Sequence, residues 1–304
     1  MASHAPSPGT ADPLGLAGVV PPTVTAFDDQ GELNEAATAA HAQFVVERGA
    51  NAVFPLGTNG EFALLSAAER YRVVETVVEA VDVPVIAGVG CPSTRETVAH
   101  ATHAERVGAE GVVAVTPYYY PVDGDGMVDH YRALTAAVDV PVYVYHIPGN
   151  AGNRLSLETV QRIAELEGIA GLKDSSKDVP WLAQAIDANP QVTFLAGSDS
   201  LLFAGLELGC SGMVSAVANV FPELVVDLYE AYDDGDESRA RELQSTVFDV
   251  RSALKRGPYL AGVKTALSVR DVGFDVGRLR RPLRTMADAD RKDLKRDLTD
   301  LGLL

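Results

Sequence analysis

The sequence predicts an α/β fold: a (β/α)8 TIM barrel with a C-terminal three-helix extension. Three observations lead to this fold class. Short apolar runs bounded by proline and glycine alternate with amphipathic stretches of helical period. There are eight runs of each kind in about 220 residues, as a (β/α)8 barrel requires. After residue 235 the strand-like runs stop and only helical patterns follow.

The strand-like runs are continuously apolar, which is typical of parallel strands buried on both faces. They cover residues 18–27, 52–57, 84–90, 111–117, 141–148, 169–175, 192–199 and 212–217. A doubly wound open sheet is the alternative architecture, but it usually has fewer strands. Its nucleotide-binding form carries a glycine-rich fingerprint after the first strand, and here that strand ends in Thr25-Ala26-Phe27-Asp28.

The helical stretches each follow a strand and carry start and stop signals. They cover residues 35–48, 67–81, 94–107, 127–138, 157–166, 179–188, 201–208 and 222–232. Ser66, Ser93 and Ser156 are candidate N-caps. Glycines stand just beyond five helix ends, at Gly49, Gly108, Gly168, Gly209 and Gly235.

The extension is predicted as three helices over residues 237–255, 260–272 and 285–301. The first of them would bury a stripe formed by Leu243, Val247, Val250 and Leu254. The chain is therefore expected to divide into a disordered lead (1–13), a barrel (14–235) and a helical extension (236–304).

Composition limits the possible partners. The 304 residues include 42 acidic and 25 basic side chains, a net charge of −17, and 47% are hydrophobic. That apolar content excludes a disordered acidic protein, and the acidity argues against nucleic acid or an anionic membrane as partner. The chain has 24 Asp but only 6 Lys, which suits the surface of a halophilic protein in a salty cytoplasm.

Neither disulfides nor metal sites are expected. Cys91 and Cys210 are the two cysteines, too few for a disulfide framework, and are interpreted as reduced thiols. His100 and His103 share a helix face but have no third ligand nearby, so no metal is predicted. Residues 1–12 lack the apolar segment of a signal peptide and no apolar run reaches 18 residues, so the expected location is cytoplasmic.

The sixth strand carries the most informative residue. In a barrel, functional groups lie at the carboxyl ends of the strands. Side-chain alternation places Ile169, Gly171 and Lys173 on one face, so that Lys173 points into the barrel near its top. A desolvated lysine is a nucleophilic amine suited to Schiff-base chemistry. The alternative is a lysine paired with a buried carboxylate, Asp174 or Asp199.

Three other strand ends could hold a small anion. Strand two ends in a turn, Gly57-Thr58-Asn59-Gly60-Glu61, whose backbone N–H groups could bind an anion or could form an ordinary Asn-Gly turn. Strands seven and eight end in small residues around Gly197, Ser198 and Val214. These would suit a small carboxylate or carbonyl ligand, or equally close packing.

Aromatic residues gather at two further strand ends. Strand four ends in Tyr118-Tyr119-Tyr120, which cannot all be buried and could pack at a subunit interface. On strand five, Tyr143 and Tyr145 share one face, and a phenol in a barrel lumen needs a hydrogen-bond partner. His146 is interpreted as a strand-end histidine bonded to nearby backbone.

Taken together, these residues resemble the dihydrodipicolinate synthase / N-acetylneuraminate lyase superfamily of class I, pyruvate-dependent aldolases. The resemblance covers about residues 16–304. Its markers are Gly57-Thr58-Asn59-Gly60-Glu61, Thr116-Pro117-Tyr118-Tyr119, Tyr145-x-x-Pro148 and Gly171-Leu172-Lys173-Asp174, in order and on the expected strands. It implies a homotetramer that binds pyruvate and needs no cofactor beyond the covalent Schiff base.

The resemblance also implies roles for individual residues. Lys173 would form the Schiff base and Tyr145 would transfer protons at the substrate oxygen. Thr58 would relay a proton to Tyr145 and, with Asn59, hold the pyruvate carboxylate. Tyr119 would match the tyrosine that such enzymes insert into a neighbouring subunit's site. The backbone near the pyruvyl group would come from Gly197 and Val214.

Departures from the family pattern indicate the substrate. Asn150 stands where dihydrodipicolinate synthases generally carry an arginine that grips aspartate semialdehyde; an amide suits a hydroxylated aldehyde better. Asn59 replaces a second threonine and His146 replaces the commoner asparagine. The expected substrate is 2-keto-3-deoxygluconate or its 6-phosphate, as in an acidic, haloarchaeal-type proteome. Dihydrodipicolinate synthesis, sialic acid cleavage, a keto-acid dehydratase and a catalytically silent binding barrel remain alternatives.

Overall fold

A computed structural model of the chain describes residues 12–304. It contains two compact units, each built from two segments of the sequence. The first unit comprises the chain up to Gly18 together with Pro84–Val214. The second comprises Val19–Val83 together with Ser215–Leu304. The C-terminal helices thus share the second unit with the helices that follow the first two strand runs.

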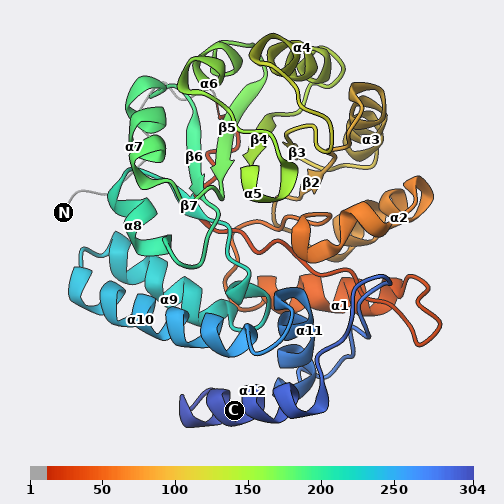
Figure 1. The fold of residues 1–304 in the computed structure, drawn as a ribbon, viewed down its shortest axis with the longest axis vertical. Helices are drawn as coiled ribbons and strands as arrows, with labels where there is room; N and C mark the ends of the chain where they lie inside the picture. The colour runs from red at the N-terminus through yellow and green to blue at the C-terminus, as the bar shows by residue number, and fades with distance from the viewer. Residues whose placement is uncertain (1–11) are drawn as a thin grey trace. The chain divides into compact units, whose positions relative to one another are not determined.

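The first unit is built on a parallel sheet. Its strands are β2 (Ile86–Gly88), β3 (Gly111–Val115), β4 (Val142–His146), β5 (Ile169–Asp174), β6 (Thr193–Ala196) and β7 (Gly212–Met213). The sheet order is β1-β7-β6-β5-β4-β3-β2, with β1 at Gly18–Val19. Every residue of these strands is buried, as their continuous apolar runs predict. Figure 1 shows β3 to β6 side by side.

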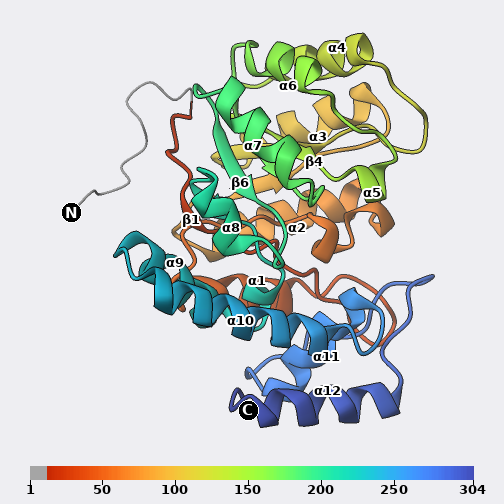
Figure 2. The same ribbon diagram turned by 60° about the vertical axis from the view of Figure 1, so that its left-hand side comes forward.

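Helices separate successive strands of the first unit. They are α3 (Thr94–Arg106), α4 (Gly124–Thr135), α5 (Pro148–Ala151), α6 (Leu157–Ala164), α7 (Val179–Ala188) and α8 (Leu202–Glu207). Ser93 and Ser156 accept the N–H group three residues on, which confirms both as N-caps. Neighbouring helices α3, α4, α6 and α7 pack in sequence order outside the strands (Figure 2).

A buried aspartate lies at the start of the described chain. Residues 1–11 of the expected disordered lead are outside the described residues. Asp12, which the sequence assigned to the same lead, is instead buried. Its carboxylate accepts the N–H groups of Leu14 and Leu16 and, at 2.7 Å, the hydroxyl of Tyr143. Asp12 thus supplies the partner that a lumen-facing phenol requires.

The first two predicted strands are largely absent as regular strands in the structure. Of the run 18–27 only Gly18–Val19 forms a strand, and the run 52–57 forms only an isolated bridge. Pro21, Pro22 and Pro55 have no N–H group, so they interrupt the ladder. The two runs still pair through Phe54 N–H to the Pro21 carbonyl (2.9 Å) and Thr23 N–H to the Phe54 carbonyl (3.0 Å). Within residues 12–304 the chain therefore has seven strands where eight were expected.

The remaining elements of the second unit are helical. They are α1 (Glu35–Val46), η1 (Thr58–Gly60), η2 (Phe62–Leu64), α2 (Ala67–Ala80), η3 (Val217–Asn219), α9 (Pro222–Asp233), α10 (Glu237–Leu254), α11 (Tyr259–Arg270) and α12 (Asp288–Asp300). The last three confirm the helices predicted after residue 236. As expected, α10 buries Leu243, Val247, Val250 and Leu254, and it lies alongside α9 in Figures 1 and 2.

A buried ion pair ties the C-terminal helices to the turn after η1. The Nζ of Lys264, on α11, lies 2.8 Å from a carboxylate oxygen of Glu61 and also donates to the Arg278 carbonyl at 3.1 Å. The other oxygen of Glu61 accepts the backbone N–H of Arg280 at 2.8 Å. Lys264 and Glu61 are each only 4% exposed. Burial lowers the pKa of Lys264, and the charge of Glu61 acts in the opposite direction.

Removing one member of this pair should be strongly destabilising. Lys264→Met would leave the Glu61 carboxylate buried without its cation, and we expect the free energy of unfolding to fall by about 3–5 kcal/mol. The matched control is Lys295→Met at an exposed position of α12, with an expected change within about 0.5 kcal/mol. Guanidinium unfolding at constant salt measures both. Similar losses in the two variants would contradict a structural role for the pair.

Candidate active site

Two of the predicted catalytic residues face each other across neighbouring strands. In the parallel ladder between β4 and β5, Tyr145 is paired with Lys173. Each side chain is 4% exposed. The Nζ of Lys173 lies 3.3 Å from the centroid of the Tyr145 ring. The structure therefore brings together the amine and the phenol that the sequence had selected separately.

The surroundings of Lys173 favour a reactive amine. Burial is the main influence and lowers the pKa of Lys173, because the charged ammonium loses its hydration. Tyr145, Asp174 and Asp199 act in the opposite direction and favour the charged form. A lysine held between these influences is neutral more often than one in water. The same three neighbours would stabilise a positive charge on the nitrogen of Lys173 after reaction.

Gly197 lies against the stem of Lys173. A Cβ at this position would overlap Ser175 Oγ and lie 3.0 Å from Lys173 Cε. The N–H of Gly197 donates to the Asp174 carbonyl at 2.7 Å, and the Gly197 carbonyl accepts the Ser175 hydroxyl at 2.7 Å. The N–H of Val214 likewise donates to the Ala196 carbonyl. The N–H groups of both residues are therefore engaged in the fold.

The other predicted site residues of the first unit differ in how far they are exposed to solvent. Ser198 is buried directly after Gly197. Asn150 is exposed on α5, and Tyr119 is 84% exposed. Tyr119 also has a left-handed backbone with φ of 78°, which is costly for a residue with a large side chain. Its ring meets that of Tyr120 edge to face at 5.0 Å.

The predicted carboxylate-binding turn belongs to the second unit. Thr58, Asn59 and Gly60 form the 3₁₀ turn η1, in which Asn59 is buried. The hydroxyl of Thr25 donates to the Gly60 carbonyl at 2.8 Å. The turn ends at Glu61, which has a left-handed backbone and the buried contact with Lys264 described above. The turn is therefore fixed by its own backbone and by the C-terminal helices.

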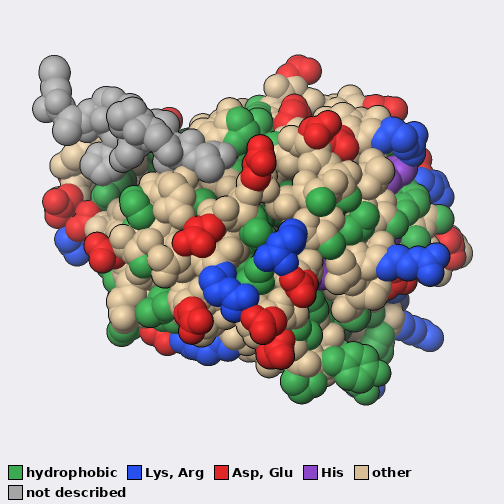
Figure 3. Space-filling view, turned by 90° about the horizontal axis from the view of Figure 1, so that it is seen from above, with side chains coloured by type: hydrophobic (Ala, Val, Ile, Leu, Met, Phe, Trp, Pro, Cys, Tyr) green, Lys and Arg blue, Asp and Glu red, His purple; other side chains and the backbone are tan. Residues whose placement is uncertain are grey.

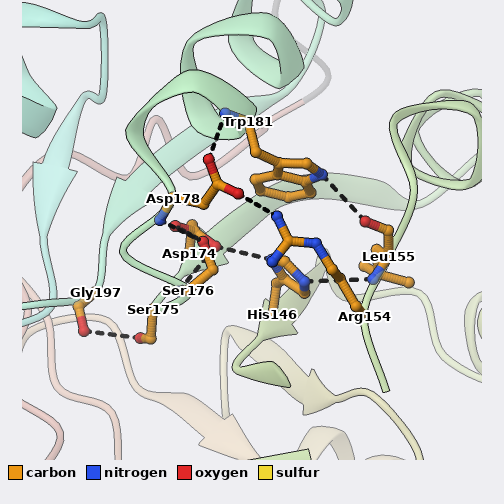
Figure 4. A network of polar contacts seen from close by, with 9 residues as sticks. All are labelled: His146, Arg154, Leu155, Asp174, Ser175, Ser176, Asp178, Trp181 and Gly197. Atoms are coloured by element: carbon orange, nitrogen blue, oxygen red, sulfur yellow. Dashed lines mark hydrogen bonds and ion pairs between the residues drawn. The ribbon is translucent and has the colours of Figure 1, made fainter. Parts of the chain in front are cut away.

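Sequence reasoning missed the contact between His146 and Asp174 (Figure 4). The imidazole Nδ1 lies 2.8 Å from the Asp174 carboxylate, and the N–H of Leu155 donates to Nε2 at 3.3 Å. His146 thus bonds to backbone, as expected, and also to a carboxylate that was considered as a partner for Lys173. The available signal was position: each residue directly follows a predicted catalytic residue at a strand end.

The described residues offer no candidate metal site. Over residues 12–304 no cluster of three or more His, Cys, Asp and Glu side chains is arranged to hold a metal ion. Cys91 and Cys210 are both buried and are not joined to each other. No helix in this part of the chain is long and apolar enough to cross a membrane.

Comparison with known proteins assigns this arrangement to a family. The profile of the dihydrodipicolinate synthetase family matches residues 15–301. The chain belongs to this family. A protein of Halobacterium salinarum named an uncharacterized DapA-like lyase is 66% identical over the whole of both chains. The 4-hydroxy-tetrahydrodipicolinate synthase of Methanopyrus kandleri is 37% identical over 95% of this chain and 97% of its own.

A solved structure extends the family relation to the fold. The crystal structure of YagE, a prophage protein of the same family from E. coli K12 in complex with pyruvate, is similar with a TM-score of 0.91. The two chains are 30% identical, and the match covers 95% of this chain and 99% of that one. The predicted (β/α)8 TIM barrel with C-terminal helices is confirmed. The protein is an enzyme of a carbon–carbon lyase family whose members are pyruvate-dependent.

The close approach at Gly197 gives a direct test of the packing around Lys173. Gly197→Ala should force Ser175 and Lys173 to move and should lower the free energy of unfolding by about 1–3 kcal/mol, the usual cost of overpacking. Gly149→Ala on α5 is the control, because an added Cβ there meets nothing within 4 Å. Urea unfolding of both variants measures the difference. An unchanged Gly197→Ala variant would show that this packing is loose.

Proposed function

We propose that this enzyme reversibly cleaves a 2-keto-3-deoxy sugar acid to pyruvate and an aldehyde through a Schiff base on Lys173. The substrate would be 2-keto-3-deoxygluconate, its 6-phosphate or both, and the aldehyde glyceraldehyde or its 3-phosphate. The observation that carries the proposal is the buried Lys173 amine held 3.3 Å from the Tyr145 ring, in a family of pyruvate-dependent lyases.

The reaction begins at the keto carbon. The neutral amine of Lys173 attacks C2 of the keto acid, and the resulting carbinolamine loses water to give a protonated iminium. The desolvated environment of Lys173 supports the first step by increasing the neutral fraction of the amine. The cationic iminium then withdraws electrons from the C3–C4 bond. No metal or other cofactor is required by this scheme.

Tyr145 would act as base and then as acid. It accepts the proton of the C4 hydroxyl as the C3–C4 bond breaks, which releases the aldehyde and leaves an enamine on Lys173. Protonation of the enamine at C3 and addition of water at C2 then release pyruvate and restore the amine. In this scheme Thr58 relays the proton to and from Tyr145.

The remaining predicted site residues would bind substrate or complete the site. Thr58, Asn59 and Gly60 would hold the pyruvate carboxylate. The carbonyls of Gly197 and Val214, with Ser198, would line the pyruvyl group. The exposed Tyr119, in its strained conformation, suits a residue that contacts a second subunit, and a homotetramer is the proposed assembly.

Asn150 supports the choice of substrate. Its amide can hydrogen-bond to hydroxyl groups but cannot form the bidentate ion pair with which an arginine would hold a second carboxylate.

A second candidate function is the condensation of pyruvate with aspartate semialdehyde. It is favoured by relatives such as the Methanopyrus kandleri protein, which is named a 4-hydroxy-tetrahydrodipicolinate synthase.

The charge of the chain supports a proposed cytoplasmic, halophilic setting. The net charge is −17, and Figure 3 shows acidic and basic side chains interspersed on the face that it displays. Dense surface carboxylates repel one another less where salt screens them. The relation to a Halobacterium salinarum protein agrees with this setting.

Borohydride trapping tests the Schiff base. Pyruvate and borohydride together should attach a reduced adduct to Lys173, detectable by peptide mass spectrometry, and Lys173→Ala should abolish it. Lys295→Ala, at an exposed site, should be labelled like the wild type. Since deprotonation produces the nucleophile, the trapping rate should rise with pH, with a midpoint below 10.5. An adduct that persists in Lys173→Ala would disprove the assignment.

A substrate comparison separates the two candidate functions. We expect turnover of 2-keto-3-deoxygluconate or its 6-phosphate to exceed that of pyruvate plus aspartate semialdehyde by at least about tenfold in kcat/KM, a difference of about 1.4 kcal/mol in transition-state binding. Coupled assays of released pyruvate and of condensation product measure both at molar salt. Turnover of the semialdehyde pair alone would establish the second candidate.

A further inference from the structure

A second pair of side chains lies directly behind Tyr145 and Lys173. The ladder that pairs Tyr145 with Lys173 also pairs His146 with Asp174, one residue further along both strands. Because successive side chains of a strand point to opposite faces, His146 and Asp174 occupy the other face of the sheet. Both are deeply buried, at 0% and 3% exposure.

Two hydrogen bonds hold the ring of His146 in one orientation. Its Nε2 accepts the backbone N–H of Leu155 at 3.3 Å. Its Nδ1 lies 2.8 Å from the Asp174 carboxylate, to which it donates. The indole of Trp181 covers the ring, with centroids 4.3 Å apart, and its Nε1 donates to the Leu155 carbonyl. Both ring nitrogens and the ring plane are thus held.

Asp174 accepts further hydrogen bonds from the chain segment that follows it. Besides His146, it accepts the backbone N–H of Ser176 at 3.1 Å and the Ser176 hydroxyl at 2.9 Å. Three donors therefore hold this carboxyl group in one orientation. The nearby Asp178 caps α7 through the Trp181 N–H and pairs with Arg154, so its charge is compensated (Figure 4).

We propose that His146 and Asp174 are positioning residues that hold the ends of β4 and β5 in register and keep one buried negative charge beside Lys173, where it favours the cationic iminium. The inference rests on the proposed Schiff-base function. Formation of the iminium places a full positive charge on a lysine with little access to water. A fixed anion on the adjoining residue stabilises that charge without any reorganisation during the reaction.

The two residues make separable contributions. Asp174 provides the charge, whereas His146 donates the bond that orients the carboxylate. Asp174→Asn removes the charge and preserves the shape. His146→Leu removes the donor, and His146→Asn restores one, because the asparagine amide nitrogen can take the place of Nδ1. Asp178→Asn is the matched control, since it alters a neighbouring carboxylate that belongs to the capped and paired group on α7.

Two measurements on folded protein test the proposal. The first is the pyruvate concentration that gives half-maximal borohydride trapping at Lys173. We expect Asp174→Asn to raise it about tenfold, the effect of losing one buried charge on the adjoining residue. His146→Leu should raise this pyruvate concentration and lower the kcat of the proposed cleavage reaction. His146→Asn should recover at least part of each loss. Asp178→Asn should lower the melting temperature modestly and leave both values near those of the wild type.

The second measurement does not depend on pyruvate. The pH dependence of Lys173 acetylation reports its pKa, to which Tyr145, Asp174 and Asp199 are the contributing neighbours. Loss of the anion in Asp174→Asn should move the labelling midpoint down by about one pH unit or more. An unchanged midpoint together with wild-type trapping would overturn the proposal. If instead wild-type Lys173 is not trapped while the midpoint shifts, the Schiff-base function fails and the charge effect stands.

Discussion

The parallel register between β4 and β5 is the constraint on which the candidate active site depends. It sets Tyr145 opposite Lys173 on one face of the sheet and His146 opposite Asp174 on the other. A rigid backbone ladder can hold such pairs more accurately than a loop can. Gly171, on β5 itself, supports the same arrangement, because a Cβ there would lie 2.6 Å from the Thr193 carbonyl on β6 and 2.8 Å from the Tyr143 ring on β4. The absence of that side chain lets the strands approach beneath the reactive amine.

The C-terminal helices have an equivalent role in the second unit. The turn Thr58–Gly60 leads into Glu61, whose carboxylate is held by Lys264 from α11 and by the backbone of Arg280. A buried ion pair adds little net stability over an apolar contact, but losing one partner is costly, so the pair fixes the position of the segment that carries it. The extension beyond the last strand is therefore part of the support of a candidate binding turn.

Lysine is rare in this protein, and the two buried lysines have different surroundings. Only six of the 304 residues are lysines, and two of these, Lys173 and Lys264, are each 4% exposed. Their surroundings differ: Lys264 faces the carboxylate of Glu61, whereas Lys173 faces the ring of Tyr145. Lys173 was predicted because a lysine in a buried strand is conspicuous. Lys264 was missed because it lies in a helix, where periodicity alone does not reveal which polar side chain turns inward.

The sequence by itself determined the alternation of strands and helices, the serine caps and the burial of Lys173, because these follow from local periodicity and side-chain chemistry. Only the tertiary structure decided that the first two strand runs, which contain Pro21, Pro22 and Pro55, are reduced to a two-residue strand and isolated backbone bonds, and that Asp12 bonds to Tyr143. It also decided that Asp174 binds His146 and that the N–H of Gly197 is already engaged. The physical reason is that a buried polar group takes whichever partner the strand register brings within reach, and register is set by contacts between segments far apart in the sequence.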